Sequence, residues 1–120
     1  MDQVFLLAPT STDERIQHVV NQARGFIYYV SLKGVTGAAT LDVKSAAERI
    51  AKIKQQTDLP IGVGFGISDA ASAKVMGAVA DAVIVGSAFV KPFATQNVEE
   101  ASALAVAKVK ELRTALDELR

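Results

Sequence analysis

The sequence contains no cysteine, no tryptophan and a single histidine. Without cysteine, the chain cannot be a disulfide scaffold, a thiolate metal site or an enzyme with a cysteine nucleophile. One histidine and no cluster of carboxylates provide no ligand set for a metal, so we expect neither a metal nor a cofactor. The histidine, His18, stands beside Val19 and Val20 in the middle of a helical segment. This position favours a solvated helix residue over a general base.

An excess of charge of one sign is also absent. Thirteen Lys+Arg balance thirteen Asp+Glu and give a formal net charge of +0, so no basic field attracts nucleic acid or an anionic membrane surface. No apolar run approaches the roughly 20 residues that span a bilayer. The start, Met1-Asp2-Gln3, lacks the basic and apolar parts of a signal peptide. We therefore expect a cytoplasmic protein that binds neither nucleic acid nor membrane.

The 120 residues, 50% of them hydrophobic, fit one domain over residues 1–120. Along the chain a short apolar run, a turn with Gly, Ser, Thr or Pro, and a charged helical segment follow one another repeatedly. The apolar runs do not alternate with polar residues, so each is expected to be a strand of a parallel sheet, covered on both faces. The expected strands are Val4–Ala8, Phe26–Val30, Ile61–Phe65 and Ala82–Val85.

Capping signals predict where the helices begin. Ser11 with Glu14, and Asn97 with Glu100, have capping-box spacing, and Ser68 precedes a third helical run. Lys91-Pro92 is expected to break the chain after the fourth strand, which leaves room for a short helical turn at about 87–90. The predicted helices cover about 11–24, 42–56, 68–79 and 97 to the last residue.

Apolar residues at helical spacing predict the faces that these helices bury. Three carboxylates are explained without catalysis, as cap, helix-dipole or strand-entry residues: Asp42, Asp69 and Asp81. The expected buried faces are Ile16, Val19, Val20 and Ala23 in the first helix, Val43, Ala46, Ala47, Ile50 and Ile53 in the second, and Val98, Ala101, Ala105, Val109, Leu112, Leu116 and Leu119 in the last.

The loops that follow the last three strands are suited to an anion. Ligands of parallel α/β folds collect at the carboxyl ends of the strands. The loop 31–40 carries two glycines and one lysine and is expected to be a lid, Gly64 and Gly66 flank the end of the third strand, and Gly86-Ser87 opens a short helix. Each glycine alone is more often a simple turn, but the combination at one sheet edge favours phosphate binding by backbone amides.

Three segments in this order closely resemble the second half of the tryptophan synthase alpha chain family: Gly34–Ala38, Gly62–Ser68 and Ala80–Val90. The opening Phe5–Ser11 also resembles that family's fifth strand and the turn after it. The resemblance implies four βα units, corresponding to strands five to eight, that form half of a TIM (β/α)8 barrel. A flavodoxin-like three-layer rearrangement is the alternative, because βα units serve both folds.

The resemblance implies a lyase of tryptophan biosynthesis that cleaves indole-3-glycerol phosphate by a retro-aldol reaction and passes indole to a PLP-dependent beta subunit. By the same resemblance, the phosphate is held by Gly37, Gly66, Gly86 and Ser87, and the substrate pocket includes Tyr28, Thr36 and Phe65. The family's acid and base carboxylates belong to its early strands, which this chain does not resemble. No catalytic residue is therefore assigned, and the isolated chain is expected to bind phosphate without turnover.

Four strands in barrel order cannot close on themselves, so two sheet edges are expected to stay open. A second copy of the chain or the missing N-terminal half of the barrel would cover them. This leaves two other functions to weigh: a noncatalytic, self-associating half-barrel that binds phosphate, and a fragment of another phosphate-binding barrel, such as an isomerase or epimerase.

Overall fold

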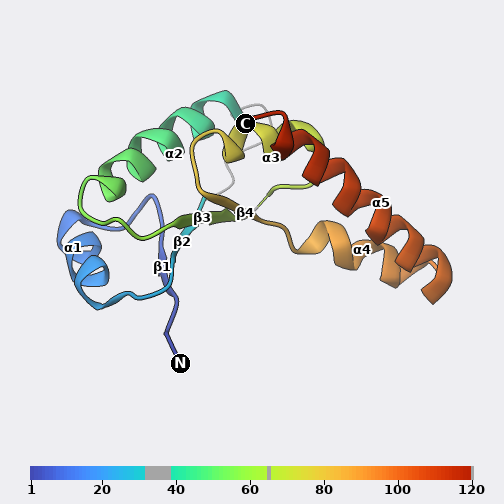
Figure 1. Ribbon diagram of the computed structural model, residues 1–120, viewed down its shortest axis with the longest axis horizontal. Coiled ribbons are helices and arrows are strands. Elements are labelled where there is room, and N and C mark those ends of the chain that lie inside the picture. Colours follow the sequence, from blue (N-terminus) through green and yellow to red (C-terminus); the bar gives the residue numbers. More distant parts are fainter. Residues whose placement is uncertain (32–38, 65, 120) are drawn as a thin grey trace.

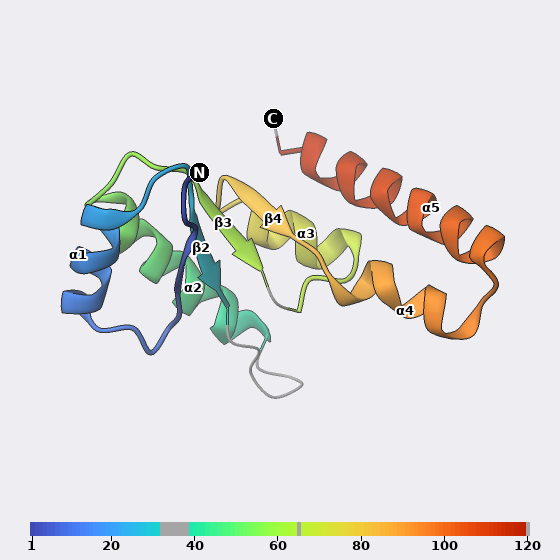
Figure 2. The same ribbon diagram turned by 90° about the horizontal axis from the view of Figure 1, so that it is seen from below.

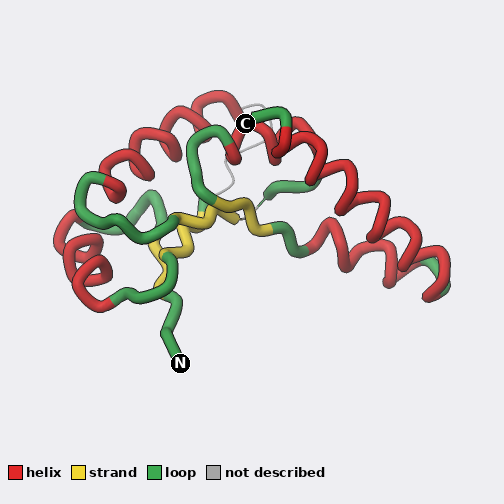
Figure 3. Tube along the Cα trace, viewed as in Figure 1, coloured by secondary structure: helices red, strands yellow, loops and turns green. Residues whose placement is uncertain are grey.

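The structure is a computed structural model that describes residues 1–31, 39–64 and 66–119. All four expected strands are present, each within its predicted range, and helices follow them in the expected order (Figures 1 and 3). The elements are β1 (Phe5–Leu7), α1 (Asp13–Gln22), β2 (Ile27–Val30), α2 (Ala39–Lys54), β3 (Ile61–Gly64), α3 (Ala70–Gly77), β4 (Ala82–Ile84), α4 (Ser87–Thr95) and α5 (Val98–Asp117).

The four strands form one parallel sheet in the order β1-β2-β3-β4. Helices α1, α2 and α3 arch over one face of this curved sheet, and the opposite, concave face is left open (Figures 1 and 2). A flavodoxin-like fold instead changes strand order at a switch point and covers both faces with helices. The sequential order with helices on one face therefore confirms the half barrel and excludes the three-layer alternative.

The core lies between the convex face of the sheet and the first two helices. Its fully buried side chains come from alternate strand positions and from one stripe on each helix, because the β period of two and the helical period of 3.6 each bring one apolar face to the interface. Most of the stripes predicted for α1 and α2 is buried, whereas Val20, Val43 and Ala47 are half-buried. The residues at or below 3% exposure in this region are Leu7, Ile16, Val19, Ile27, Tyr29, Ala46, Ile50, Ile53, Ile61 and Val63.

The concave face is filled locally by aromatic rings that lie over glycines. Tyr28 and Tyr29 point to opposite faces as expected, since Tyr29 is in the core and Tyr28 is half-buried on the other side. A Cβ placed on Gly64 would lie 2.6 Å from Cζ of Tyr28, and one on Gly62 would lie 3.5 Å from the ring of Phe26. Both glycines of β3 are therefore needed for close packing.

Two predicted helix starts are shifted by one residue because another side chain caps the amides. Thr12, not Ser11, caps α1, since its Oγ1 accepts a hydrogen bond from the Arg15 N–H at 3.1 Å. The Ser11 hydroxyl instead accepts from the Ala8 N–H at 2.9 Å, within the preceding turn. Asp69, not Ser68, caps α3.

Of the other residues predicted to stand at helix or strand boundaries, some are confirmed and one is not. Helix α2 begins at Ala39, so Asp42 lies inside the helix and the prediction that it caps the helix is wrong. The Asn97 cap is confirmed, since its Oδ1 accepts from the Glu100 N–H at 2.9 Å. Asp81 is confirmed at the entry of β4, where its carboxylate accepts from the Ile61 N–H at 2.9 Å.

The two C-terminal helices depart most from expectation. The predicted break at Lys91-Pro92 is wrong, because α4 continues through Pro92 to Thr95 and the Pro92 carbonyl accepts from the Gln96 N–H at 2.8 Å. Proline removes one helical donor, but its fixed φ is compatible with a helix. In α5 only Ala101, Leu112 and Ala115 are buried.

Part of the stripe predicted for α5 is exposed to solvent. Val98 is 72%, Val109 is 52% and Leu119 is 39% exposed, so the prediction that these three residues are buried is wrong. The principal neighbours of α5 are α3 and α4 rather than the sheet, and the two C-terminal helices extend together beyond β4 (Figures 1 and 2). An apolar stripe broader than its covering is therefore left partly bare.

Candidate phosphate site

The ends of β2, β3 and β4 lie in line at one edge of the sheet. Val30 pairs with Gly64, and Gly64 pairs with Ile84. Gly66 stands two residues beyond the end of β3, and Gly86 stands two residues beyond the end of β4. The topology therefore brings the loops that contain these two glycines to the same edge, as predicted from the sequence.

Ser31 ties the ends of β2 and β3 together. This buried residue is 5% exposed, and both its N–H, at 3.0 Å, and its hydroxyl, at 2.9 Å, donate to the Gly64 carbonyl. The paired backbone thus continues one residue beyond β2, on the side where the loops emerge. This contact was not predicted from the sequence, because a serine after a strand gives no signal of a carbonyl that is 33 residues away.

Gly66 adopts a left-handed backbone conformation, with φ of 81°. L-residues with side chains are disfavoured there, so glycine is required by the turn itself. Gly66 is exposed and the following Ile67 is 5% exposed, which anchors the turn in the core. The Gly66 backbone is therefore held in a fixed turn and remains open to solvent.

Among the four helices whose N-cap the structure describes, α4 alone begins without a side-chain cap. Its N-cap, Gly86, makes no side-chain cap hydrogen bond, whereas the N-caps of α1, α3 and α5 do so through Thr12, Asp69 and Asn97. An uncapped first turn leaves N–H donors and the positive end of the helix dipole for a ligand.

Space is also open at the start of α4. Apart from Gly86 and its two chain neighbours, no atom of the described chain lies within 4 Å of a Cβ built on Gly86, and Ser87, the first residue of the helix, is exposed. The Cβ position of Gly86 and the Ser87 residue therefore face open space.

The start of α3 does not offer the free amides expected after the third strand. Asp69 Oδ1 accepts from the Ser72 N–H at 2.8 Å, and Glu111 of α5 accepts from the Ala70 N–H at 3.0 Å. The backbone N–H and hydroxyl of Ser72 hold the pKa of Asp69 below its ordinary value. The expectation of free N–H groups at this helix is wrong for Ala70 and Ser72, because both already donate to carboxylates.

The remaining predicted site residues are only partly described. Tyr28 lies on the concave face, with its phenol over Gly64 at the end of β3. Thr36, Gly37 and Phe65 lie outside the described residues. The strand register therefore places Gly66, Gly86 and Ser87 in loops at the same end of the sheet, and Tyr28, also predicted, lies against Gly64 at that end.

Within residues 1–31, 39–64 and 66–119, no three His, Cys, Asp or Glu side chains are grouped as metal ligands. None of the described helices has the length and apolar character of a membrane span. His18 is exposed on α1, as expected.

The comparisons with known proteins agree with the motifs at this edge. The family model described as tryptophan synthase alpha chain matches residues 1–118. The chain belongs to the tryptophan synthase alpha chain family. Among curated relatives, the tryptophan synthase alpha chains of Acinetobacter baumannii and Acinetobacter baylyi are 77% and 79% identical over 119 residues. The resemblance inferred from the three sequence segments is confirmed.

Solved structures of the family confirm the fold. The tryptophan synthase alpha subunit of Campylobacter jejuni is 33% identical, with a TM-score of 0.80 over 93% of this chain and 44% of that chain. A tryptophan synthase structure from Mycobacterium tuberculosis is 34% identical, with a TM-score of 0.77 over 97% of this chain and 41% of that one. The alignment with the Acinetobacter relatives includes 99% of this chain but only 45% of each relative. The chain therefore spans less than half of their length and corresponds to the C-terminal half of the family's barrel.

Proposed function

We propose that this chain supplies the phosphate-binding half of an indole-3-glycerol phosphate site in a tryptophan synthase alpha chain. The observation that best supports this proposal is the uncapped N-terminus of α4 at Gly86. It lies at the same end of the sheet as the left-handed turn of Gly66. Backbone amides that converge on a phosphate need no excess of positive side chains, which suits a chain with net charge +0.

Each residue has a distinct role in this proposal. The amides of Gly66, Gly86 and Ser87 donate to phosphate oxygens, and the Ser87 hydroxyl adds a further donor. The Tyr28 ring provides an apolar wall for the indole, because it covers the concave face beside the strand ends. By family resemblance, Gly37 joins the phosphate donors, and Thr36 and Phe65 complete the pocket.

The proposed reaction also needs proton transfers that this half does not supply. Retro-aldol cleavage requires protonation of the indole ring carbon and removal of a proton from a glycerol hydroxyl. Positioned acid and base groups typically contribute about 10²–10⁴-fold each. The carboxylate of Asp69 is engaged in capping α3. We assign the acid and base to the first half of the family's barrel, so this chain alone binds but does not turn over.

A charge at the start of α4 tests the phosphate site. Ser87→Asp places a carboxylate where the phosphate would lie, and we expect affinity for indole-3-glycerol phosphate to fall at least about tenfold in titration calorimetry. Ser102→Asp, at an exposed position of α5, is the matched control and should retain the wild-type affinity. Equal affinities for the two variants would contradict the proposed site.

Complementation tests the division of labour. Indole release is measured with this chain alone, and then after mixing with the first half of the Acinetobacter baumannii alpha chain. We expect release only from the mixture, and turnover by this chain alone would contradict the assignment of the acid and base. Competition by an indole analogue distinguishes this activity from that of another phosphate-binding barrel, such as an isomerase or epimerase.

For the intact family member we propose the beta subunit as the partner that receives indole. The Mycobacterium tuberculosis relatives are solved as tryptophan synthase, including an aminoacrylate-bound form. The cytoplasmic location stays a prediction.

A further inference from the structure

The hydroxyl of Ser31 is a buried polar group at the end of the sheet where the candidate site lies. Ser31 follows β2 directly and is 5% exposed. Serine is mostly exposed in proteins, and a buried hydroxyl needs a hydrogen-bond partner. The Ser31 hydroxyl donates to the Gly64 carbonyl at 2.9 Å, and the Ser31 N–H donates to the same oxygen at 3.0 Å. Because the N–H bond alone continues the pairing of β2 with β3, the hydroxyl adds a contact that this pairing does not need.

Gly64, the last residue of β3, is held from several directions. In the sheet it pairs with Val30 on one side and with Ile84 on the other. The ring of Tyr28 covers its concave side, since a Cβ placed on Gly64 would lie 2.6 Å from Cζ of Tyr28. The two donors of Ser31 then fix the direction of its carbonyl. Gly64 is therefore a fixed base from which the loop after β3 starts.

The turn that contains Gly66 is short and is anchored on both sides. Ile67, which follows Gly66, is 5% exposed and belongs to the hydrophobic core. Only two residues separate Ile67 from Gly64, and one of them is Gly66, whose backbone is left-handed and exposed. A span of two residues between fixed ends has few conformations. The position of the Gly66 amide therefore depends on how firmly the Gly64 carbonyl is held.

We propose that Ser31 is a positioning residue of the phosphate site, whose hydroxyl holds the Gly66 amide in its binding position through the Gly64 carbonyl. This inference rests on the proposed function and assigns Ser31 no contact with the ligand. Without the hydroxyl, the Gly64 carbonyl loses one of its two donors from Ser31, and the turn samples positions in which the Gly66 amide misses the phosphate. The apparent affinity then falls in proportion to the fraction of chains that keep the binding position.

Removal of the hydroxyl tests the proposal. Ser31→Ala keeps the backbone N–H bond, and we expect its affinity for indole-3-glycerol phosphate in titration calorimetry to fall about three- to tenfold, the equivalent of one hydrogen bond. Ser31→Thr retains a hydroxyl and should bind nearly as tightly as the wild type. An unchanged affinity of Ser31→Ala, or a folded Ser31→Thr that binds as weakly as Ser31→Ala, would overturn the proposal.

Ile53→Val is the matched control for a general loss of stability. Ile53 is fully buried in the last turn of α2, where the neighbouring Lys54 bonds to Asp81 at the entry of β4, at the opposite end of the sheet from the site. Loss of one buried methylene group destabilises a core, as loss of a hydrogen bond does. Ile53→Val should nevertheless retain the wild-type affinity. An equal loss of affinity in Ile53→Val and Ser31→Ala would show that Ser31 acts only through stability.

Nitrogen-15 relaxation of the ligand-free chain separates this inference from the proposed function. The order parameter of the Gly66 amide should be lower in Ser31→Ala than in the wild type and unchanged in Ile53→Val. Failure of the wild type to bind indole-3-glycerol phosphate would refute the phosphate site, whereas an equally ordered Gly66 amide in all three proteins would refute positioning by Ser31. If Ser31→Ala loses helical signal in circular dichroism, Ser31→Cys, with a similar shape and a weak donor, is measured in its place and should show the same changes.

Discussion

The first half of this chain and its last two helices carry similar apolar periodicity, yet they are buried very differently. Ile16, Ile50 and Ile53 of α1 and α2 are at most 1% exposed, whereas α4 has no buried residue and Val98 of α5 is 72% exposed. The early helices lie against a sheet, while α5 packs mainly against α3 and α4. The periodicity of a helix therefore indicates which face can be buried, but the neighbouring element determines how much of that face is covered.

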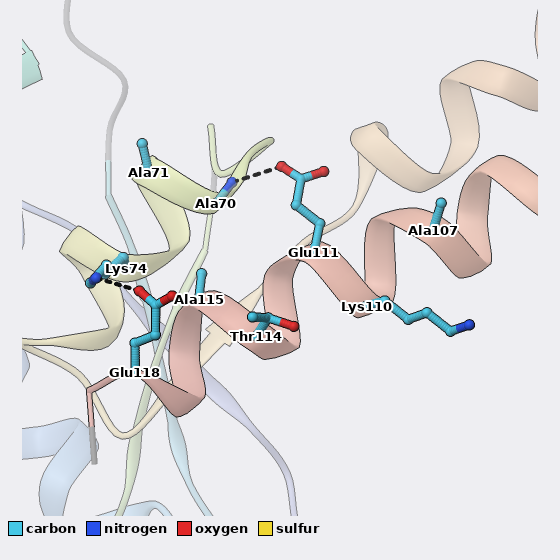
Figure 4. A pocket seen from close by; sticks show the side chains of 9 residues that line it. All are labelled: Ala70, Ala71, Lys74, Ala107, Lys110, Glu111, Thr114, Ala115 and Glu118. Carbon is cyan, nitrogen blue, oxygen red and sulfur yellow. Dashed lines mark hydrogen bonds and ion pairs between the residues drawn. The ribbon is translucent and has the colours of Figure 1, made fainter.

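An open groove lies between α5 and the neighbouring helix α3. About 630 Å³ of open groove is lined by small side chains, including Ala70, Ala107 and Ala115 (Figure 4). Polar contacts bridge it, since Lys74 Nζ lies 2.5 Å from Glu118 Oε2 and the Ala70 N–H donates to Glu111. These polar contacts add to buried apolar side chains of the same two helices, among them Met76 and Leu112.

The largest expected effect comes from the core of the first region. Ile50→Ala should lower the free energy of unfolding by about 2–5 kcal/mol, because it leaves a cavity under a side chain that is 1% exposed. Val106→Ala on α5 removes an exposed side chain and should change it by less than about 0.5 kcal/mol at low protein concentration. Urea unfolding measures the free energy of unfolding of both variants. Equal losses would contradict the difference in burial between the first helices and α5.

Two glycines at the strand ends, Gly64 and Gly86, allow the same comparison between a tightly packed position and an open one. Gly64→Ala should destabilise the fold by about 1–3 kcal/mol, since a Cβ there collides with the Tyr28 ring against a strand backbone. Gly86→Ala should change stability by less than about 0.5 kcal/mol, because its φ is −115° and nothing described lies within 4 Å. Thermal unfolding of the two variants tests this prediction. A loss of stability in Gly86→Ala as large as that in Gly64→Ala would contradict it.

Asp81 links the entry of β4 to β3 and α2, and it gives a prediction for acid stability. The Ile61 N–H, followed by Lys54, lowers the pKa of Asp81 below its ordinary value of 3.8. A lowered folded-state pKa means that the contribution is present above pH 3.8 and is lost as the pH falls below it. Asp81→Ala should cost about 1 kcal/mol at pH 7. In unfolding curves recorded against pH, the difference from wild type should shrink below pH 3.8, and a difference that persists unchanged would refute this account.

The smallest effect is expected at the surface of the α3–α5 groove. Lys74→Ala removes an ion pair whose side chains are 47% and 56% exposed. Exposed pairs contribute about 0–1 kcal/mol and are screened by salt. Denaturant unfolding at low and high salt should show a small loss that vanishes at high salt. A larger loss that is insensitive to salt would indicate that the lysine stem, rather than its charge, holds the helices together.

Local signals predicted much of this fold and part of the candidate site. Continuous apolar runs placed all four strands, and glycines at Gly66 and Gly86 marked the loops that reach one sheet edge. Helix starts were less accurate, because Ser11 and Thr12 are both capable caps and the turn at Ala8 engages the first of them. The occupied N-terminus of α3 was missed, since its partner Glu111 is 41 residues away and no local pattern marks it.

By itself, the sequence determined the order of βα units, the buried stripes of α1 and α2, and the glycine turns at the strand ends, because each depends on residues close together in the chain. Only the tertiary structure decided which of the described helix N-termini lack a carboxylate or hydroxyl partner and which apolar side chains of α4 and α5 are exposed. Those outcomes depend on contacts with residues far away in the sequence. Glu111 makes such a contact at the start of α3, whereas no described residue lies near the Cβ position of Gly86. These contacts are set by packing in three dimensions, where distant residues compete for the same donors and surfaces.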